Sequence, residues 1–199
     1  MRIPGYKYAG IAAIAVEYVA LTYFLSIGRQ TLSLSHTVSD FGTFDSTRLV
    51  FSLAFSLAGV LFGLFGTWLS RKLPLHRNFL ITLYVGVIAQ IALSWLPVQG
   101  NTKPWHYWAA TIVMFVMPLL VYYFTLANKN RAVRLLARGI LGLEALAIIL
   151  LPLSIAWHVS LIAEGLTFLG FQLWVALATF EDYDIDQSKR TIRRQERHG

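Results

Sequence analysis

The stretch that decides the fold is residues 49–70, LVFSLAFSLAGVLFGLFGTWLS, which contains no charged side chain. An α-helix rises about 1.5 Å per residue, so a run of this length can cross the hydrocarbon core of a bilayer, which is about 30 Å thick. Over the whole chain, hydrophobic residues make up 56% and charged residues only 14%, whereas soluble domains carry about 25% charge. The composition excludes a soluble globular domain and a disordered chain, and it predicts an integral membrane protein.

Six segments of the chain are apolar and long enough to span a bilayer. They are Tyr8–Gly28, Leu49–Ser70, Phe79–Leu96, Tyr107–Ala127, Leu135–Ser154 and Val159–Phe180. The first is too long for the apolar region of a signal peptide, about 7–15 residues, so we expect an uncleaved helix. We predict an all-α fold: an integral membrane bundle of six transmembrane helices in residues 1–180, followed by a charged cytoplasmic tail at 181–199.

The residues where the fifth span meets the sixth lead to two further predictions. The turn around Trp157–His158 is so short that these two spans must form an antiparallel hairpin. Pro152 lacks the N–H that a helix requires, so we expect it to loosen or end the fifth helix.

The distribution of Lys and Arg predicts the orientation. Most of the 17 basic residues lie at the N-terminus, in the second and fourth connections and in the C-terminal tail, and only Arg29, Arg48 and Lys103 lie in the other connections. The positive-inside rule therefore predicts that both termini are cytoplasmic, and we expect a prokaryotic plasma membrane. Basic loops facing anionic lipid account for the net charge of +7, so no nucleic-acid partner is expected.

A few polar side chains fall inside the predicted spans. Glu17 and Glu144 lie near the middle of the first and fifth spans, and Gln90 and Gln172 lie in the third and sixth. A carboxylate in hydrocarbon is costly, so such residues normally face the bundle interior. Two interpretations stay open. The carboxyls form interhelical hydrogen bonds, or they belong to a proton path in a proton-coupled small-molecule transporter.

A second polar group is expected on the outer side of the membrane. We predict a ligand pocket there, formed by Ser39, Asp40, Asp45, His106, His158 and Glu164. Its favoured function is the binding or sensing of a lipid or other amphiphile without catalysis, with membrane lipids as partners.

The histidines on the same side offer an alternative. His36, His106 and His158 could ligate zinc, whose bound water would make the protein a metal-dependent lipid hydrolase at the outer interface. Their spacing is not that of a local metal motif, and the chain has no Cys to serve as a thiolate ligand. The sequence leaves open whether the protein is an enzyme.

Two groups of small residues could allow helices to approach closely. Gly59, Gly63 and Gly66 share one face of the second span, and Gly139 and Gly142 do so on the fifth. Such faces serve either packing within one chain or a homo-oligomer.

The residues around the first outer loop resemble a known family. His36-Thr-Val-Ser-Asp40-Phe-Gly42, followed by Arg48-Leu-Val-Phe51, is similar to the first outer-loop signature of the DUF998 family, within the Frag1/DRAM/Sfk1 group of six-helix membrane proteins. Pro97 followed by His106 is a second match. Phe44-Asp45 stands where DRAM-like members carry two prolines, so a DRAM-type role is not carried over. The resemblance implies a six-helix membrane fold and a connection with lipid handling.

The loop motif also has an explanation in local structure. Ser39 or Asp40 could cap the second helix or a short turn before it by accepting backbone N–H bonds. Gly42 would permit a positive φ in that turn.

Overall fold

The computed structural model describes residues 4–27, 38–75, 77–156 and 160–181. This part of the chain is helical and contains no strand. Its elements are η1 (Pro4–Tyr8), α1 (Ala9–Ser26), η2 (Val38–Gly42), α2 (Arg48–Lys72), α3 (Arg77–Trp95), η3 (Gly100–Thr102), α4 (Lys103–Ala127), α5 (Arg131–Ala156) and α6 (Ser160–Phe180). All six α-helices are long and apolar enough to cross a membrane. The predicted all-α fold is confirmed for the described residues, as are six helices long and apolar enough to span a membrane.

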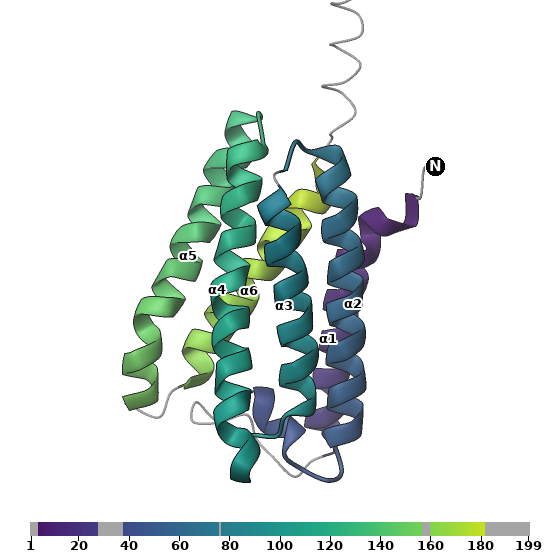
Figure 1. Cartoon of the computed structure of the whole chain (residues 1–199), viewed down its shortest axis with the longest axis vertical. Helices are drawn as coiled ribbons and strands as arrows, with labels where there is room; N and C mark the ends of the chain where they lie inside the picture. The colour runs from purple at the N-terminus through teal and green to yellow at the C-terminus, as the bar shows by residue number, and fades with distance from the viewer. Residues whose placement is uncertain (1–3, 28–37, 76, 157–159, 182–199) are drawn as a thin grey trace, which may run out of the picture.

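The helices form one bundle in which neighbours along the chain are neighbours in space (Figure 1). Each α-helix packs against the next, and contacts between α1 and α6 close the ring. Contacts between α4 and α6 cross its middle. We call the end of the bundle that holds η2 the loop end. The opposite end, where α2, α4 and α6 finish, is called the terminal end.

Two helices begin earlier than expected because their first turns are polar. Helix α4 starts at Lys103 rather than Tyr107, with Pro104 in its first turn, where a missing N–H is harmless. Helix α5 starts at Arg131 rather than Leu135. The side chain of Asn130 accepts a hydrogen bond from the backbone N–H of Ala132 at 3.0 Å and so caps α5. Hydropathy alone marks only the apolar part of each helix.

Of the two expectations for Pro152, that it ends the fifth helix is wrong, and that it loosens the helix stays a prediction. Helix α5 continues through it to Ala156. A proline removes a single backbone hydrogen bond, and membrane helices tolerate that loss. The short connection from Ala156 to Ser160 and the packing of α5 on α6 fit the predicted hairpin, while Trp157 and His158 themselves lie outside the described residues.

A core of large aromatic side chains holds the terminal half of the bundle together. Phe65, Phe79, Phe124 and Trp174 are at most 1% exposed and come from α2, α3, α4 and α6. Trp174 makes edge-to-face contacts with Phe65 and Phe124, with ring centroids 5.9 and 6.2 Å apart. Such aromatic pairs stabilise beyond the area they bury, so this core links four helices.

A second aromatic cluster packs the loop end. Phe24, Phe41, Phe51 and Phe55 are buried together, and the rings of Phe24 and Phe41 stack with centroids 5.0 Å apart. Phe24 belongs to α1 and Phe41 to η2, so the stack fastens the turn to the bundle.

The expected role of Gly42 is wrong, and its actual role follows from the same cluster. Of the glycines that the structure describes, only Gly100 has a positive φ. A Cβ at Gly42 would lie 2.9 Å from Cδ1 of Phe51, which is too close for a side chain. Glycine is therefore needed here so that the Phe51 ring can pack directly on the backbone. The N-cap of α2 is Thr47, rather than Ser39 or Asp40.

The glycines of α2 serve packing within the chain. Added Cβ atoms at Gly59, Gly63 and Gly66 would each meet a side chain of α3. By contrast, Gly139 and Gly142 on α5 are exposed, with no neighbouring atom within 4 Å of an added Cβ. A homo-oligomer through the α5 face stays a prediction.

The outer surface of the bundle carries large apolar side chains. Val19, Ile88 and Ile149 are 68–70% exposed, and they come from α1, α3 and α5. A soluble protein rarely exposes so much apolar surface on several elements. The same surface suits contact with lipid chains.

We expect Gly10→Ala to destabilise the bundle. The new Cβ would lie 2.6 Å from Cγ1 of Val175 and 2.9 Å from Cγ of Phe65, and such overpacking costs about 1–3 kcal/mol. Thermal unfolding of the detergent-purified protein measures the effect. Gly139→Ala is the matched control, because it adds the same methyl group in open space. Equal midpoints for the two variants would contradict the prediction.

Candidate functional site

The carboxyl group of Glu164 fastens the turn η2 to the start of α6. Its Oε2 accepts a hydrogen bond from the backbone N–H of Val38 at 2.8 Å. The hydroxyl of Ser39 lies 3.5 Å from Oε1, at the limit of a hydrogen bond. The two partners come from residues more than 120 positions earlier in the chain. Glu164 therefore has a clear structural role at the loop end.

His106 has a similar role between α3 and α4. Its ring is buried, and Nδ1 is hydrogen-bonded to the backbone carbonyl oxygen of Leu96, directly after α3. A carbonyl can only accept, so Nδ1 must carry the proton. This bond holds the end of α3 against the first turn of α4.

The structure brings together four of the six residues predicted for the outer pocket. Asp40 of η2 lies close enough to His106 and Glu164 for an electrostatic interaction with each, and Ser39 contacts Glu164. Asp45 is exposed and lines a different space, described next. His158 lies outside the described residues. The four grouped side chains largely hold local structure, so the open space beside them is the better candidate for a ligand.

That space is a cavity of about 320 Å³ at the loop end of the bundle. Its apolar wall is formed by Phe24, Ile27, Phe41 and Phe44, and its polar rim by Asp45, Ser46 and Thr47. The hydroxyl of Thr47 donates a hydrogen bond to the backbone carbonyl oxygen of Phe41. The cavity therefore joins an apolar, largely aromatic wall with an exposed carboxyl group at its rim, a combination that suits an amphiphile.

The sequence argument found Asp45 but missed the aromatic wall. Phe24 and Ile27 lie at the end of α1, and Phe41 and Phe44 lie in the first loop. Two phenylalanines within a short polar stretch, FGTFDST at residues 41–47, were the available signal. Their pairing with the end of α1 depends on tertiary contacts that no local pattern shows.

The predicted zinc site stays a prediction. His36 and His158, two of its three ligands, lie outside the described residues. Within the parts of the chain that the structure describes, no three His, Cys, Asp or Glu side chains are grouped so that they could hold a metal ion.

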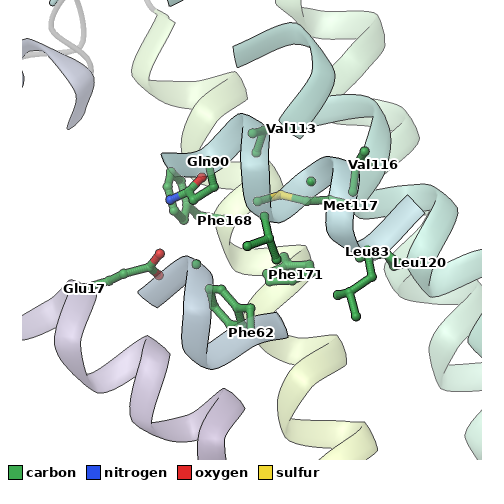
Figure 2. Close-up of a pocket in the computed structure, with 13 residues that line it drawn as sticks. Glu17, Phe62, Leu83, Gln90, Val113, Val116, Met117, Leu120, Phe168 and Phe171 are labelled. Atoms are coloured by element: carbon green, nitrogen blue, oxygen red, sulfur yellow. The ribbon is translucent and has the colours of Figure 1, made fainter. Parts of the chain in front are cut away.

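A second, smaller cavity of about 40 Å³ lies inside the bundle among α1, α2, α3, α4 and α6. It is lined by apolar side chains and by two polar ones, Glu17 and Gln90. Figure 2 shows Glu17 reaching from α1 toward the space between Phe62 and Gln90. Glu17 is 6% and Gln90 7% exposed. Among the described residues, neither side chain has a hydrogen-bond partner.

The other intramembrane polar residues lie elsewhere. Gln172 accepts a hydrogen bond from the hydroxyl of Tyr18 at 2.9 Å and so joins α6 to α1. Glu144 is completely buried, and both of its carboxyl oxygens lack a hydrogen-bond partner in the described part of the chain. It packs against Gly170 of α6 and does not line the cavity of Glu17. The proton path through Glu17 and Glu144 stays a prediction.

The comparisons with known proteins give no relative: no family model, no curated protein and no solved structure matches the chain. The resemblance to DUF998 therefore stays a prediction that depends on the motifs of residues 36–51 and on Pro97 and His106.

We expect Glu164→Ala to loosen η2. The change leaves the N–H of Val38 without its acceptor, and an unsatisfied buried donor costs about 1–3 kcal/mol. Hydrogen exchange of the amides in residues 38–42 should accelerate, and the unfolding midpoint should fall. Glu164→Gln keeps a side-chain carbonyl oxygen and should change both much less. If exchange in Glu164→Ala matched the wild type, the proposed fastening role would be wrong.

Proposed function

We propose that this protein binds a lipid or another amphiphile in the cavity at the loop end of its six-helix bundle. The observation that carries the proposal is the cavity itself, about 320 Å³ in volume, with four apolar side chains on its wall and Asp45 at its rim. Pockets for small molecules typically measure about 300–1,000 Å³ and combine an apolar lining with a few polar groups.

The wall of this cavity is well fixed. Phe24 and Phe41 stack on each other, and Phe24 also lies against Phe51, with ring centroids 6.1 Å apart. Glu164 anchors the turn that carries Phe41 through its bond to Val38. Because these side chains are already held in place, they lose little conformational entropy when an amphiphile binds.

The rim indicates which head group is favoured. Asp45 is exposed at the edge of the cavity, beside Ser46 and Thr47. A carboxylate only accepts hydrogen bonds. The preferred amphiphile therefore carries a donor, either an amine or a hydroxyl group, next to its apolar chain.

The position of the cavity fits a site at the membrane interface. Trp105 and Trp108, near the start of α4 at the same end of the bundle, are 66% and 67% exposed. Tryptophan is enriched where lipid chains meet head groups. An amphiphile could enter from the bilayer with its head group at that level.

The charges at the two ends support an orientation. Basic side chains gather at the terminal end. Arg71 and Lys72 end α2, Arg77 begins α3, Lys129 follows α4 and Arg131 begins α5. The described basic residues at the loop end are Arg48 and Lys103. By the positive-inside rule, the terminal end and both termini face the cytoplasm, and the cavity opens on the outer side. The resemblance of the loop to DUF998 and its lipid-handling relatives favours the same function.

We expect the purified protein to retain lipid, and to lose it when the cavity is altered. Native mass spectrometry of the full chain, extracted in a mild detergent, measures the bound mass. Phe44→Ala should weaken retention by removing apolar contact, and Asp45→Asn by removing the charge that attracts the head group. Phe115→Ala, at an exposed position of α4 away from the cavity, is the matched control. Retention that is equal in all three variants would refute the proposed site.

A separate prediction concerns the orientation. The chain has no cysteine, so a single introduced cysteine reports its own side of the membrane. Gln99→Cys at the loop end should react with a membrane-impermeant maleimide in intact cells. Lys129→Cys at the terminal end should react only after lysis. Both positions are exposed, and the reverse pattern would invert the proposed topology.

A further inference from the structure

The interior cavity is separate from the cavity at the loop end and shares no residue with it. Its polar groups are Glu17 from α1 and Gln90 from α3, both more than nine-tenths buried and both directed at the same space (Figure 2). A buried polar group normally has a hydrogen-bond partner, and these two have none among the described residues. Two buried polar side chains that line one cavity without a hydrogen-bond partner indicate a binding site for a polar ligand.

We propose that the interior cavity is a binding site for a small organic ammonium group. No basic side chain lines the cavity, so an ammonium ligand would supply the positive charge that stabilises an ionised Glu17 carboxyl group. The amide carbonyl of Gln90 supplies a second acceptor for an ammonium N–H. Phe62, Phe168 and Phe171 complete the lining with aromatic rings, and such rings attract organic cations.

The residues that line the cavity disfavour other classes of ligand. An anion would meet the acidic Glu17 with no basic residue to compensate it. A calcium ion takes six to eight oxygen ligands, and the side chains that line this cavity offer those of one carboxyl and one amide only. An organic ammonium needs fewer polar contacts, because its alkyl part packs against apolar side chains such as Met117 and Val113.

The size of the cavity sets the size of the group. About 40 Å³ holds about three water molecules, at 10–15 Å³ each. Ethylammonium has a similar number of non-hydrogen atoms and is a suitable probe. Glycines shape the space: a Cβ at Gly86 would lie 2.5 Å from Cγ1 of Val116, and one at Gly59 would lie 3.4 Å from Cγ of Gln90. Because these glycines carry no side chain, α2, α3 and α4 can lie close together around a small ligand.

The experiment measures thermal unfolding of the full chain in detergent. Ethylammonium chloride is titrated against sodium chloride at equal ionic strength, and ethanol serves as the neutral analogue. A ligand that binds only the folded state raises the midpoint in a saturable way, by about 2–4 °C for each 1 kcal/mol in a chain of this size. We expect such a rise with ethylammonium and none with ethanol beyond the salt reference.

Variants locate the effect. Glu17→Gln should abolish the ethylammonium shift, and Gln90→Leu should reduce it. Glu144→Gln is the matched control, because Glu144 is also buried but does not line the cavity, and its shift should equal that of the wild type. An equal shift with ethanol would mean that the cavity holds only water or any small polar solute, and would overturn the proposal. A wild-type protein that shows no ethylammonium shift would also overturn the proposal, and this result is decisive even if Glu17→Gln fails to fold. A shift that persists in Glu17→Gln would overturn it as well.

Discussion

Hydrocarbon offers no hydrogen bonds, so each polar group placed in it must find a partner within the protein. Helices meet this constraint for their own backbone, and a few side chains meet it between helices. The hydroxyl of Ser52 on α2 donates to the backbone carbonyl oxygen of Ser94 on α3 at 2.6 Å. Tyr18 bonds Gln172 between α1 and α6. These bonds join α2 to α3 and α1 to α6.

The polar groups that lack such partners are the informative ones. Glu164 and His106 were candidates for a ligand site, yet both bind backbone groups and hold the loop end together. Glu17 and Gln90 are also buried, but they line a cavity. Burial alone therefore does not separate structural from functional groups. A candidate binding group also needs unpartnered polar atoms and a cavity beside them, and Glu144 is unpartnered but does not line the interior cavity.

The sequence predicts the six helices well because membrane-spanning segments are long and continuous in composition. It predicts their ends less well, since the polar first turns of α4 and α5 are invisible to hydropathy and Pro152 lies inside a helix that continues. The grouping of Ser39, Asp40, His106 and Glu164 follows from their expected depth on the same side. The aromatic wall beside Asp45 and the tight contact of Gly42 with Phe51 depend on packing between distant segments, which a single sequence does not reveal.

The contact of Glu144 with Gly170 constrains how this chain can change over time. A Cβ at position 170 would lie 2.5 Å from Oε1 of Glu144 and 3.0 Å from its Cδ, and α5 and α6 are packed against each other at that point. A larger residue at 170 is therefore compatible only with a shorter side chain at 144. Substitutions at positions 144 and 170 are therefore coupled, and related chains that keep this hairpin should vary the two residues together.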